Sequence, residues 1–387
     1  MINHKSRLVI IITSIIILII YFLSSAGNTA FNHFILLADA FLKGHLYIEG
    51  VYPWLEKVPI DINRWYVTNP PMPAIIALPF VLIFGKEFPQ QIIAHIFGMG
   101  IVGMTMILSY KIKKDIKLAI WSGLLIGLGS IVWFLSSVGS VWYLGQVTSA
   151  FFLTWALVEI FGKSRPILLG ILLGSVFLSR SHTALVFPFM IFMNWNKFKN
   201  IKILTKLILV FSIFAIFGFS YNYLRFGNPF DNGYSLIPDV NTSSWFSSGL
   251  WSPTYIPKNF NIFFLKLPVI RDTFPYIVPS LAGMSIILTT PAFIYAFFAA
   301  KKDLVTKLSW ISILIILFIV ASHGGTGFSQ FGYRFAVDFY PFLMLLTIKG
   351  IVKQNGPRWH NWLLLLICII VNTWGVLFIN KFDWVGW

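Results

Sequence analysis

Cysteine and charge are both scarce in this chain of 387 residues. Its single cysteine, Cys368, excludes a disulfide within the chain and a metal site built from several thiolates. Charged residues make up 11% of the sequence and apolar residues 57%, whereas a soluble domain carries about a quarter charged residues. This composition excludes a soluble globule and predicts an all-α polytopic membrane protein, embedded in membrane lipids.

Acidic residues are the rarer of the two charge types, with 13 Asp and Glu against 29 Lys and Arg. A net charge of +16 would suggest a nucleic-acid partner in a soluble protein. Here the basic residues instead gather in short clusters between apolar runs, which is the positive-inside pattern of membrane proteins. We therefore expect no nucleic-acid partner and expect each cluster to be cytoplasmic. The clusters lie at residues 5–7, 111–117, 163–165, 196–202, 301–307 and 349–358.

Apolar runs predict about 11 transmembrane helices plus one half-span, in a single domain over residues 1–387 of the plasma membrane. The first run, after Arg7, is interpreted as an anchor rather than as a signal peptide. Residues 72–85 form a helix of only about 21 Å and contain Pro73 and Pro79, so we expect them to penetrate halfway. Two full crossings there would place residues 111–117 outside. The crossings are expected at residues 8–25, 90–110, 119–137, 141–161, 166–178, 183–194, 206–222, 274–300, 308–321, 337–348 and 362–378.

The first long polar interruption, outer loop 1 at residues 28–73, holds four of the 13 carboxylates. Apolar residues at helical period over 31–42 predict an amphipathic helix that lies in the membrane interface and ends at Gly44. Asp39 falls on its water-facing stripe with His33 beside it. Outer loop 2 at 223–271, outer loop 3 at 323–337 and the turns near Gln146 and Arg180 face the same side. A site on one side of the membrane follows.

Three arginines near the outer membrane surface are candidates for binding a phosphate, because a guanidinium donates two parallel hydrogen bonds and stays charged when dehydrated. They are Arg180, Arg225 and Arg334. The structural alternatives are that Arg334 pairs with Asp338 one helical turn on, that Arg180 extends toward the interface, and that Arg225 belongs to a plain turn. The glycines at 324–327 do not form a phosphate loop, since no strand precedes them.

Asp39 is the candidate general base, because an ionised carboxylate above the membrane could accept a proton from an acceptor hydroxyl. The alternative is an ordinary ion pair with Lys43. Asp61 and Glu56 are weaker candidates because nothing in the sequence defines their geometry. His33 and His323 are interpreted mainly as hydrogen-bonded interface histidines, with His33 retained as a further catalytic candidate.

Four segments of the chain resemble the GT-C superfamily of membrane glycosyltransferases, which includes protein O-mannosyltransferases and lipid A aminoarabinose transferases. They are ADAFLKG at 38–44, NPPMP at 69–73, GILLGSVFLSR at 170–180 and FGYRF at 331–335. The resemblance implies a polyprenyl-phosphate sugar donor, an outward-facing site and an acidic residue in the first outer loop as base or metal-site residue. The relatives open the interfacial helix with an acidic residue, whereas Phe31, Asn32 and His33 stand here. Asp39 is the nearest substitute.

The expected activity is therefore transfer of a sugar from a lipid-phosphate donor to a glycan, lipid or protein acceptor at the outer face. Asn69, Gln146, His182 and Tyr333 are the expected substrate-binding residues. No metal ligand is assigned, and a divalent metal is left open as a cofactor. The alternatives are a transporter or flippase of a lipid-linked or anionic solute, which would carry polar groups on broken helices near the bilayer midplane, and a polysaccharide polymerase or ligase.

Overall fold

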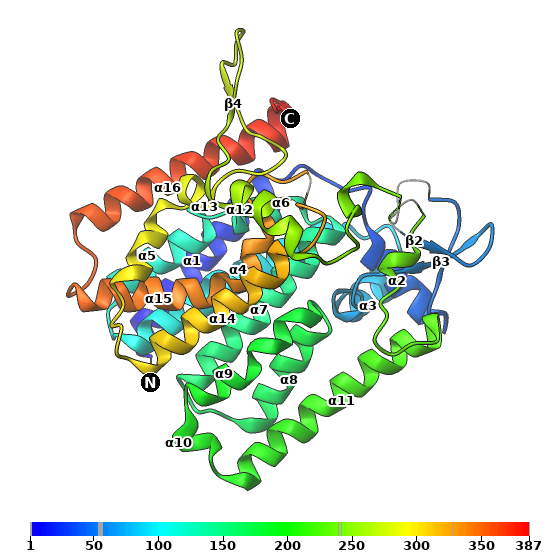
Figure 1. The fold of residues 1–387 in the computed structure, drawn as a ribbon. Helices are drawn as coiled ribbons and strands as arrows, with labels where there is room; N and C mark the ends of the chain where they lie inside the picture. The colour runs from blue at the N-terminus through cyan, green and yellow to red at the C-terminus, as the bar shows by residue number, and fades with distance from the viewer. Residues whose placement is uncertain (1, 53–56, 239, 241, 328, 387) are drawn as a thin grey trace.

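The computed structural model describes residues 2–52, 57–238, 240, 242–327 and 329–386 as a bundle of long helices with a small sheet beside it (Figure 1). Within these residues, seven helices are long and apolar enough to cross a membrane, or eight if the bent pair α5–α6 is one span. The predicted class, an α-helical multi-pass membrane protein, is confirmed. The count of about 11 crossings stays a prediction, because the other apolar segments are shorter helices.

The long helices follow the predicted apolar runs within a few residues at most ends. They are α1 (His4–Leu23), α4 (Gln90–Ile112), α7 (Val141–Ile160), α11 (Ile201–Phe226), α14 (Leu304–Ala321), α15 (Tyr340–Lys353) with the preceding turn η6 (Arg334–Phe339), and α16 (Trp359–Leu377) with the following turn η7 (Phe378–Phe382). α5 (Ile116–Gly127) and α6 (Val132–Val138) meet at 56°. The short helices are α2 (His33–Leu42), α3 (Met72–Phe84), α8 (Pro166–Phe177), η1 (Ser181–Val186), α9 (Phe187–Phe192) and α10 (Trp195–Phe198).

Helices that begin in the basic clusters are capped by short polar side chains. Asp115 accepts from the Lys117 amide, Asn200 from the Lys202 amide and Asp303 from the Thr306 amide. Each cap satisfies a backbone donor that has no partner inside the helix. The polar breaks between apolar runs therefore define where these helices start.

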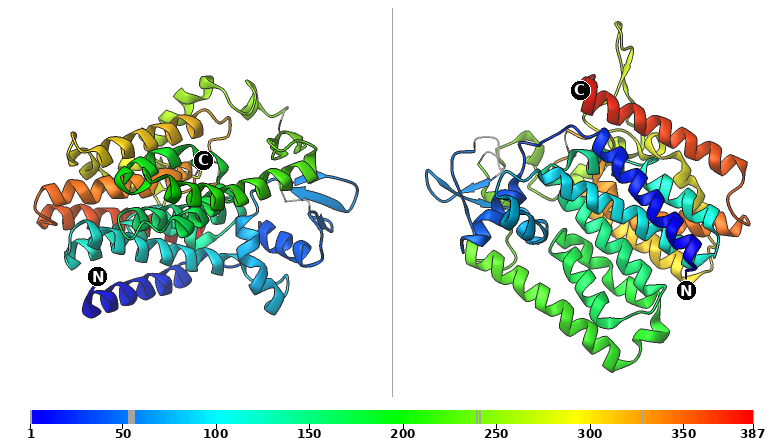
Figure 2. Two further views of the ribbon diagram at one scale, coloured as in Figure 1. Left: turned by 90° about the horizontal axis from the view of Figure 1, so that it is seen from below. Right: turned by 180° about the vertical axis from the view of Figure 1, so that it is seen from behind.

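α4 lies inside the bundle, in contact with α1, α5 and α7. α1 and α16 lie toward the surface seen from behind, in blue and red (Figure 2), and α11 is largely exposed along its length. Such apolar, exposed faces suit contact with lipid chains. Close packing elsewhere uses glycine: a Cβ on Gly350 of α15 would lie 1.9 Å from the Tyr295 carbonyl oxygen.

Outer loop 1 folds into α2 and a three-stranded antiparallel sheet of order β1-β3-β2, with β1 (Ile48–Glu49), β2 (Lys57–Pro59) and β3 (Arg64–Val67). Gly44 ends α2 with φ of +78°, as predicted. The predicted water-facing stripe of α2 is wrong for its N-terminal part, where His33 and Leu36 are buried, whereas Asp39 and Lys43 at the other end are partly exposed. The sheet and α3 cover this helix, which leaves mainly its C-terminal end open to solvent. Glu56 lies outside the described residues.

Residues 274–300 do not form the predicted single crossing. They contain β5 (Ile277–Val278), which pairs with β4 (Val269–Ile270) in the hairpin at the top of Figure 1, then α13 (Ile286–Thr289) and η5 (Pro291–Phe298). Pro275, Pro279 and Pro291 interrupt this run, because proline lacks the amide donor that a continuous helix needs. Outer loop 2 therefore extends beyond residue 271 and includes η2 (Tyr234–Leu236), η3 (Ser244–Phe246), η4 (Pro253–Tyr255) and α12 (Ile256–Phe264).

The two ends of the bundle differ in their contacts. At one end the basic clusters meet: Lys349 pairs with Asp303 at 3.1 Å, and Asn194 donates to Ser164 Oγ at 2.9 Å. At the other end, the Val141 amide of α7 donates to the Phe31 carbonyl at 3.0 Å, which ties outer loop 1 to the bundle. The candidate site described next lies at this second end.

Candidate functional site

Arg180 and His182 share one buried carboxylate. α8 ends at Phe177, and Arg180 occupies the position just before η1. The Arg180 Nη2 atom lies 2.7 Å from Asp338 Oδ2, and His182 Nε2 lies 3.0 Å from the same oxygen. The Asp338 side chain is 0% exposed, whereas that of Arg180 is 23% exposed. Asp338 therefore holds Arg180 through a buried carboxylate, while the Arg180 side chain stays partly accessible.

Arg334 stands one turn before Asp338 on η6 and is held by other groups. Its Nε donates to the Gly327 carbonyl at 3.2 Å, and its Nη1 lies 3.5 Å from Gln146 Oε1. Gln146, buried on α7, donates its Nε2 to the Arg334 carbonyl at 2.9 Å. The predicted alternative, an Arg334–Asp338 ion pair, is not what this geometry contains, since Asp338 is held by Arg180 and His182.

The Phe335 ring brings the two guanidinium groups together. Its centroid lies 5.7 Å from Arg180 Cζ and 4.8 Å from Arg334 Cζ, and Arg334 Cζ is also 5.6 Å from the Tyr143 ring centroid. Aromatic faces stabilise cations that are partly removed from water. Arg180 and Arg334 thus flank one aromatic surface, with Asp338 compensating only part of their charge.

His323 joins this group from the end of α14, where it begins outer loop 3, the loop that the sequence predicted to lie on the same side as Arg180. Its ring packs 4.8 Å from the Trp251 ring, 5.5 Å from that of Phe246 and 5.9 Å from that of Phe335. Its Nδ1 lies 3.0 Å from the Gly325 carbonyl oxygen. Burial lowers the pKa of His323 to about 4; the Gly325 hydrogen bond opposes this shift, and the positive charges of Arg180 and Arg334 add to it. The imidazole is therefore neutral near pH 7. We call Arg180, His182, His323, Arg334 and Asp338 the charged cluster.

An apolar groove of about 710 Å³ runs beside the charged cluster, between η1, α12 and α14. Asn259 lies at its polar end, where its Nδ2 donates to the His323 carbonyl at 2.9 Å and its Oδ1 accepts from the Tyr333 hydroxyl at 3.1 Å. Leu185 of η1, on the other wall, follows His182 by three residues. The groove is lined by Leu185, Ile256, Asn259, Phe260, Phe263, Leu314, Ile315, Leu317, Phe318, Ile319, Ala321 and Tyr333. A long apolar chain could lie in it with its polar head at the charged cluster.

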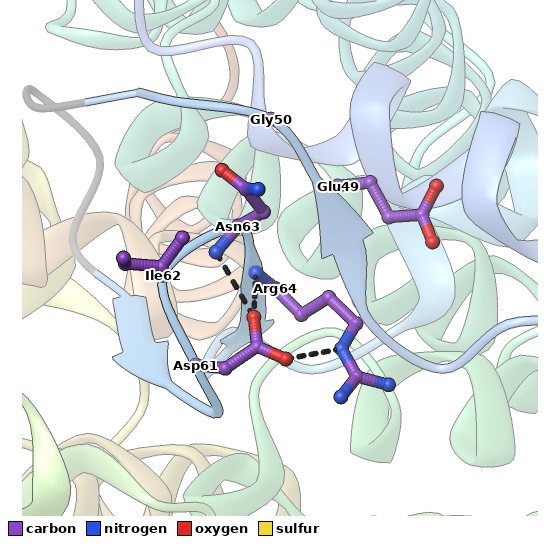
Figure 3. Close-up of a pocket in the computed structure, with 6 residues that line it drawn as sticks. All are labelled: Glu49, Gly50, Asp61, Ile62, Asn63 and Arg64. Atoms are coloured by element: carbon purple, nitrogen blue, oxygen red, sulfur yellow. Dashed lines mark hydrogen bonds and ion pairs between the residues drawn. The ribbon is translucent and has the colours of Figure 1, made fainter.

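A second hollow, of about 600 Å³, lies on the sheet of outer loop 1 and is lined by Glu49, Gly50, Asp61, Ile62, Asn63 and Arg64 (Figure 3). Asp61 accepts from the Asn63 and Arg64 amides at 2.9 Å and pairs with Arg64 Nε at 2.6 Å. The Asn63 amide first, then Arg64, lowers the pKa of Asp61. A carboxylate already engaged in this way is a weak proton acceptor, so we place the functional site at the charged cluster instead.

The other predicted catalytic residues lie on α2. Asp39 forms the ion pair with Lys43 at 2.7 Å that was its structural alternative. His33, the first residue of α2, is fully buried. α2 nonetheless approaches the charged cluster, since a Cβ on Gly145 of α7 would lie 3.9 Å from both the Phe34 ring and the Ser179 carbonyl.

Arg225 and Asn69 lie at the base of outer loop 1. Arg225 donates to the Val67 carbonyl, to the Tyr221 carbonyl at 3.1 Å and to Asn222 Oδ1 at 3.1 Å. These bonds join α11 to β3 and account for most of its donors, so Arg225 is a structural clamp in this geometry. Asn69 Oδ1 is buried and has no hydrogen-bond partner among the described residues, and the nearby Met72 amide bonds to the Leu178 carbonyl at 3.0 Å. Asn69 thus lies near the segment that carries Arg180.

The helices of the described residues are those of an α-helical multi-pass membrane protein. The chain is similar to ArnT from Cupriavidus metallidurans bound to undecaprenyl phosphate, with a TM-score of 0.57 and 13% sequence identity over 92% of this chain and 62% of that chain. The apo state of the same protein matches with a TM-score of 0.52 and 13% identity, over 92% of this chain and 61% of that one. This chain therefore spans about three fifths of the ArnT chain. The resemblance expected from the sequence is confirmed for the fold.

No protein-family model and no curated protein sequence matches the chain. Among the described residues, no group of three or more His, Cys, Asp or Glu side chains is arranged to hold a metal ion.

Proposed function

We propose that this protein is a glycosyltransferase that moves a sugar from a polyprenyl-phosphate donor to an acceptor at the outer membrane face. The observation that carries the proposal is the charged cluster at the polar end of an apolar groove. The groove suits a prenyl chain and the cluster suits its phosphate. The solved ArnT structure with undecaprenyl phosphate, which has the same fold, supports this class of ligand.

Arg180 and Arg334 are the proposed phosphate ligands. When the bond between the sugar C1 atom and the phosphate oxygen breaks, the phosphate keeps the electron pair, and its negative charge grows. Two guanidinium groups held in place before the reaction stabilise that charge without reorganising. His182, Gln146 and Tyr333 are proposed to position these ligands, because each bonds to a member of the charged cluster or to the polar end of the groove.

The proposed site faces the outside of the cell, in a multi-pass protein of the plasma membrane. The basic clusters gather at the opposite end of the bundle, where the positive-inside rule puts the cytoplasm. A glycan, lipid or protein acceptor would then reach the charged cluster from the water above the membrane. Asn69 of outer loop 1 remains a proposed substrate-binding residue. Asp39 remains the sequence-based candidate for the general base.

A transporter or flippase is the second candidate, and the bent pair α5–α6 is the feature that would serve it. Residues 127–138, which contain the bend, carry no charged side chain. A solute pathway at the midplane would need polar groups on such a break. The buried charges of the charged cluster lie instead at one end of the bundle, which supports a transferase.

The test compares two conservative variants of buried arginines. In Arg334→Lys the charge is kept and the planar fork is lost, so we expect undecaprenyl phosphate to bind about tenfold or more weakly, as for the loss of a charge-assisted hydrogen bond of about 1.5–3 kcal/mol. Arg225→Lys, the matched control, should weaken the link to Val67 and leave lipid affinity unchanged. Binding can be measured by native mass spectrometry in detergent. Equal affinities in both variants, with a lower melting temperature for Arg334→Lys, would mean that Arg334 is structural.

A further inference from the structure

His323 has a defined tautomer. Its Nδ1 lies 3.0 Å from the Gly325 carbonyl oxygen, which can only accept a hydrogen bond. The proton of the neutral ring is therefore on Nδ1, and the lone pair is on Nε2. The Gly325 carbonyl thus orients the His323 ring and leaves Nε2 able to accept a proton, as a carboxylate or carbonyl does for a catalytic histidine.

His323 also lies next to the polar end of the apolar groove. Asn259, at the polar end of the groove, donates to the His323 carbonyl at 2.9 Å and to the Ala321 carbonyl at 3.0 Å. Leu185 on the opposite wall follows His182 by three residues. The Phe335 ring centroid lies 5.9 Å from that of His323, 5.7 Å from Arg180 Cζ and 4.8 Å from Arg334 Cζ. A phosphate bound by Arg180 and Arg334 would therefore have His323 beside it.

We propose that His323 Nε2 is the general base that takes the proton from the acceptor hydroxyl. The inference rests on the proposed glycosyl transfer. The acceptor oxygen forms a bond to the sugar C1 atom, the bond from C1 to the phosphate oxygen breaks, and the phosphate leaves with the electron pair. The hydroxyl proton moves to Nε2, so that the imidazole becomes a cation next to the departing anion. No oxidant, reductant or further reactant is needed.

Binding of the donor would make His323 a stronger base. In the free protein, burial and the charges of Arg180, Arg334 and His182 hold the pKa of His323 at about 4. A bound phosphate brings negative charge to these cations and favours the protonated ring, which raises that pKa. The base would then act only when the donor is in place, which disfavours proton transfer from water at an empty site.

His323 and Asp39 are competing assignments for the same proton. Asp39 is held by Lys43 at 2.7 Å on the solvent side of α2. His323 contacts the same aromatic ring as both proposed phosphate ligands. Geometry therefore favours His323.

The first experiment measures turnover and binding in His323→Asn. The Asn amide can still donate to Gly325, so folding is expected to survive, while the proton-accepting nitrogen is lost. With undecaprenyl-phosphate-linked hexoses and pentoses as probes, kcat should fall about a hundredfold or more and affinity for undecaprenyl phosphate should stay within about twofold. His45→Asn is the matched control, since His45 stacks on Tyr47 in outer loop 1, 4.7 Å between ring centroids. Full turnover of His323→Asn would overturn the inference.

The second experiment needs no sugar. If bound phosphate raises the pKa of His323, the lipid must bind the protonated protein more tightly, so affinity should rise as pH falls toward the pKa of the free protein. Each unit of pKa rise corresponds to about tenfold in affinity between roughly pH 7 and pH 4. His323→Asn reports the background from His182 and from the phosphate itself, whose second pKa is about 6. Identical pH profiles in both proteins would overturn the proposed coupling.

The outcomes separate the two proposals. A protein that does not bind undecaprenyl phosphate, or that turns over none of the lipid-linked sugars, contradicts the proposed function and the inference with it. A protein that binds and turns over, with His323→Asn equal to the unmodified chain, contradicts the inference alone.

Discussion

Outer loop 1 and the charged cluster are both polar regions at the same end of the bundle, but they are built in different ways. Ion pairs in outer loop 1 are local: Asp39 meets Lys43 four residues on, and Asp61 meets Arg64 three residues on. The charged cluster joins residues far apart in the chain, with 158 positions between Arg180 and Asp338 and 188 between Gln146 and Arg334. Polarity in the sequence thus points to outer loop 1, whereas the desolvated charges lie in the bundle.

The two regions also differ in how deeply their charged side chains are buried. The side chains of Lys43 and Asp39 are 58% and 26% exposed, whereas Asp338 is 0% exposed. Exposed pairs interact weakly because water and salt screen them. Charges kept out of water interact strongly, and they respond strongly when a charged ligand arrives. The buried charges of the charged cluster are therefore the better candidates for chemistry, and we propose that outer loop 1 supports and covers them.

Asp338→Asn should have the largest effect. Removing the carboxylate leaves Arg180 partly buried without its compensating charge, a change that typically destabilises by about 3 kcal/mol or more. Asp303→Asn is the control at the opposite end: asparagine keeps the helix cap, and loss of the partly exposed ion pair with Lys349 is expected to cost about 1 kcal/mol or less. Unfolding in detergent, followed by tryptophan fluorescence, measures both. If the two variants lose equal stability, the Asp338 carboxylate contributes no more to the free energy of unfolding than an ordinary ion pair does.

Asp39→Asn should have a much smaller effect. Its ion pair with Lys43 is exposed, so we expect melting temperature and turnover to stay close to those of the unmodified protein. The sequence-based assignment of Asp39 as base requires instead a loss of about a hundredfold in kcat. Measured beside it, Asp61→Asn and His33→Gln test the other two catalytic candidates of outer loop 1. A large loss in any of these with normal lipid binding would return the base to this region.

The last prediction concerns orientation in the membrane. The cysteine substitutions that test it are expected to leave stability and activity unchanged. In a Cys368→Ser background, a cysteine at Lys43 should react with an impermeant maleimide in intact cells, because outer loop 1 is proposed to be outside. A cysteine at Lys114 should not react, because the positive-inside rule predicts that this basic cluster is cytoplasmic. Labelling of Lys114→Cys would show that α3 crosses the membrane fully and would invert our orientation of the following helices.

Sequence reasoning located the membrane helices well and the site only in part. Apolar runs define α1, α4 and α7 because a lipid-exposed helix must be apolar over its full length. The same rule failed over residues 274–300, where prolines break an equally apolar stretch. Arg180 and Arg334 were selected because charge near the membrane is costly, whereas His323 was interpreted as a hydrogen-bonded interface histidine.

By itself the sequence determined the membrane class, the ends of most helices and the collection of polar residues on one side, since each depends on composition or on neighbours within one turn. It also determined the local pair of Asp39 and Lys43. Only the tertiary structure decided that Asp338 pairs with Arg180 rather than with Arg334, and that His323 joins them. Those contacts depend on how η1, η6 and the end of α14 pack together, and side chains more than 150 positions apart leave no periodic trace in the chain.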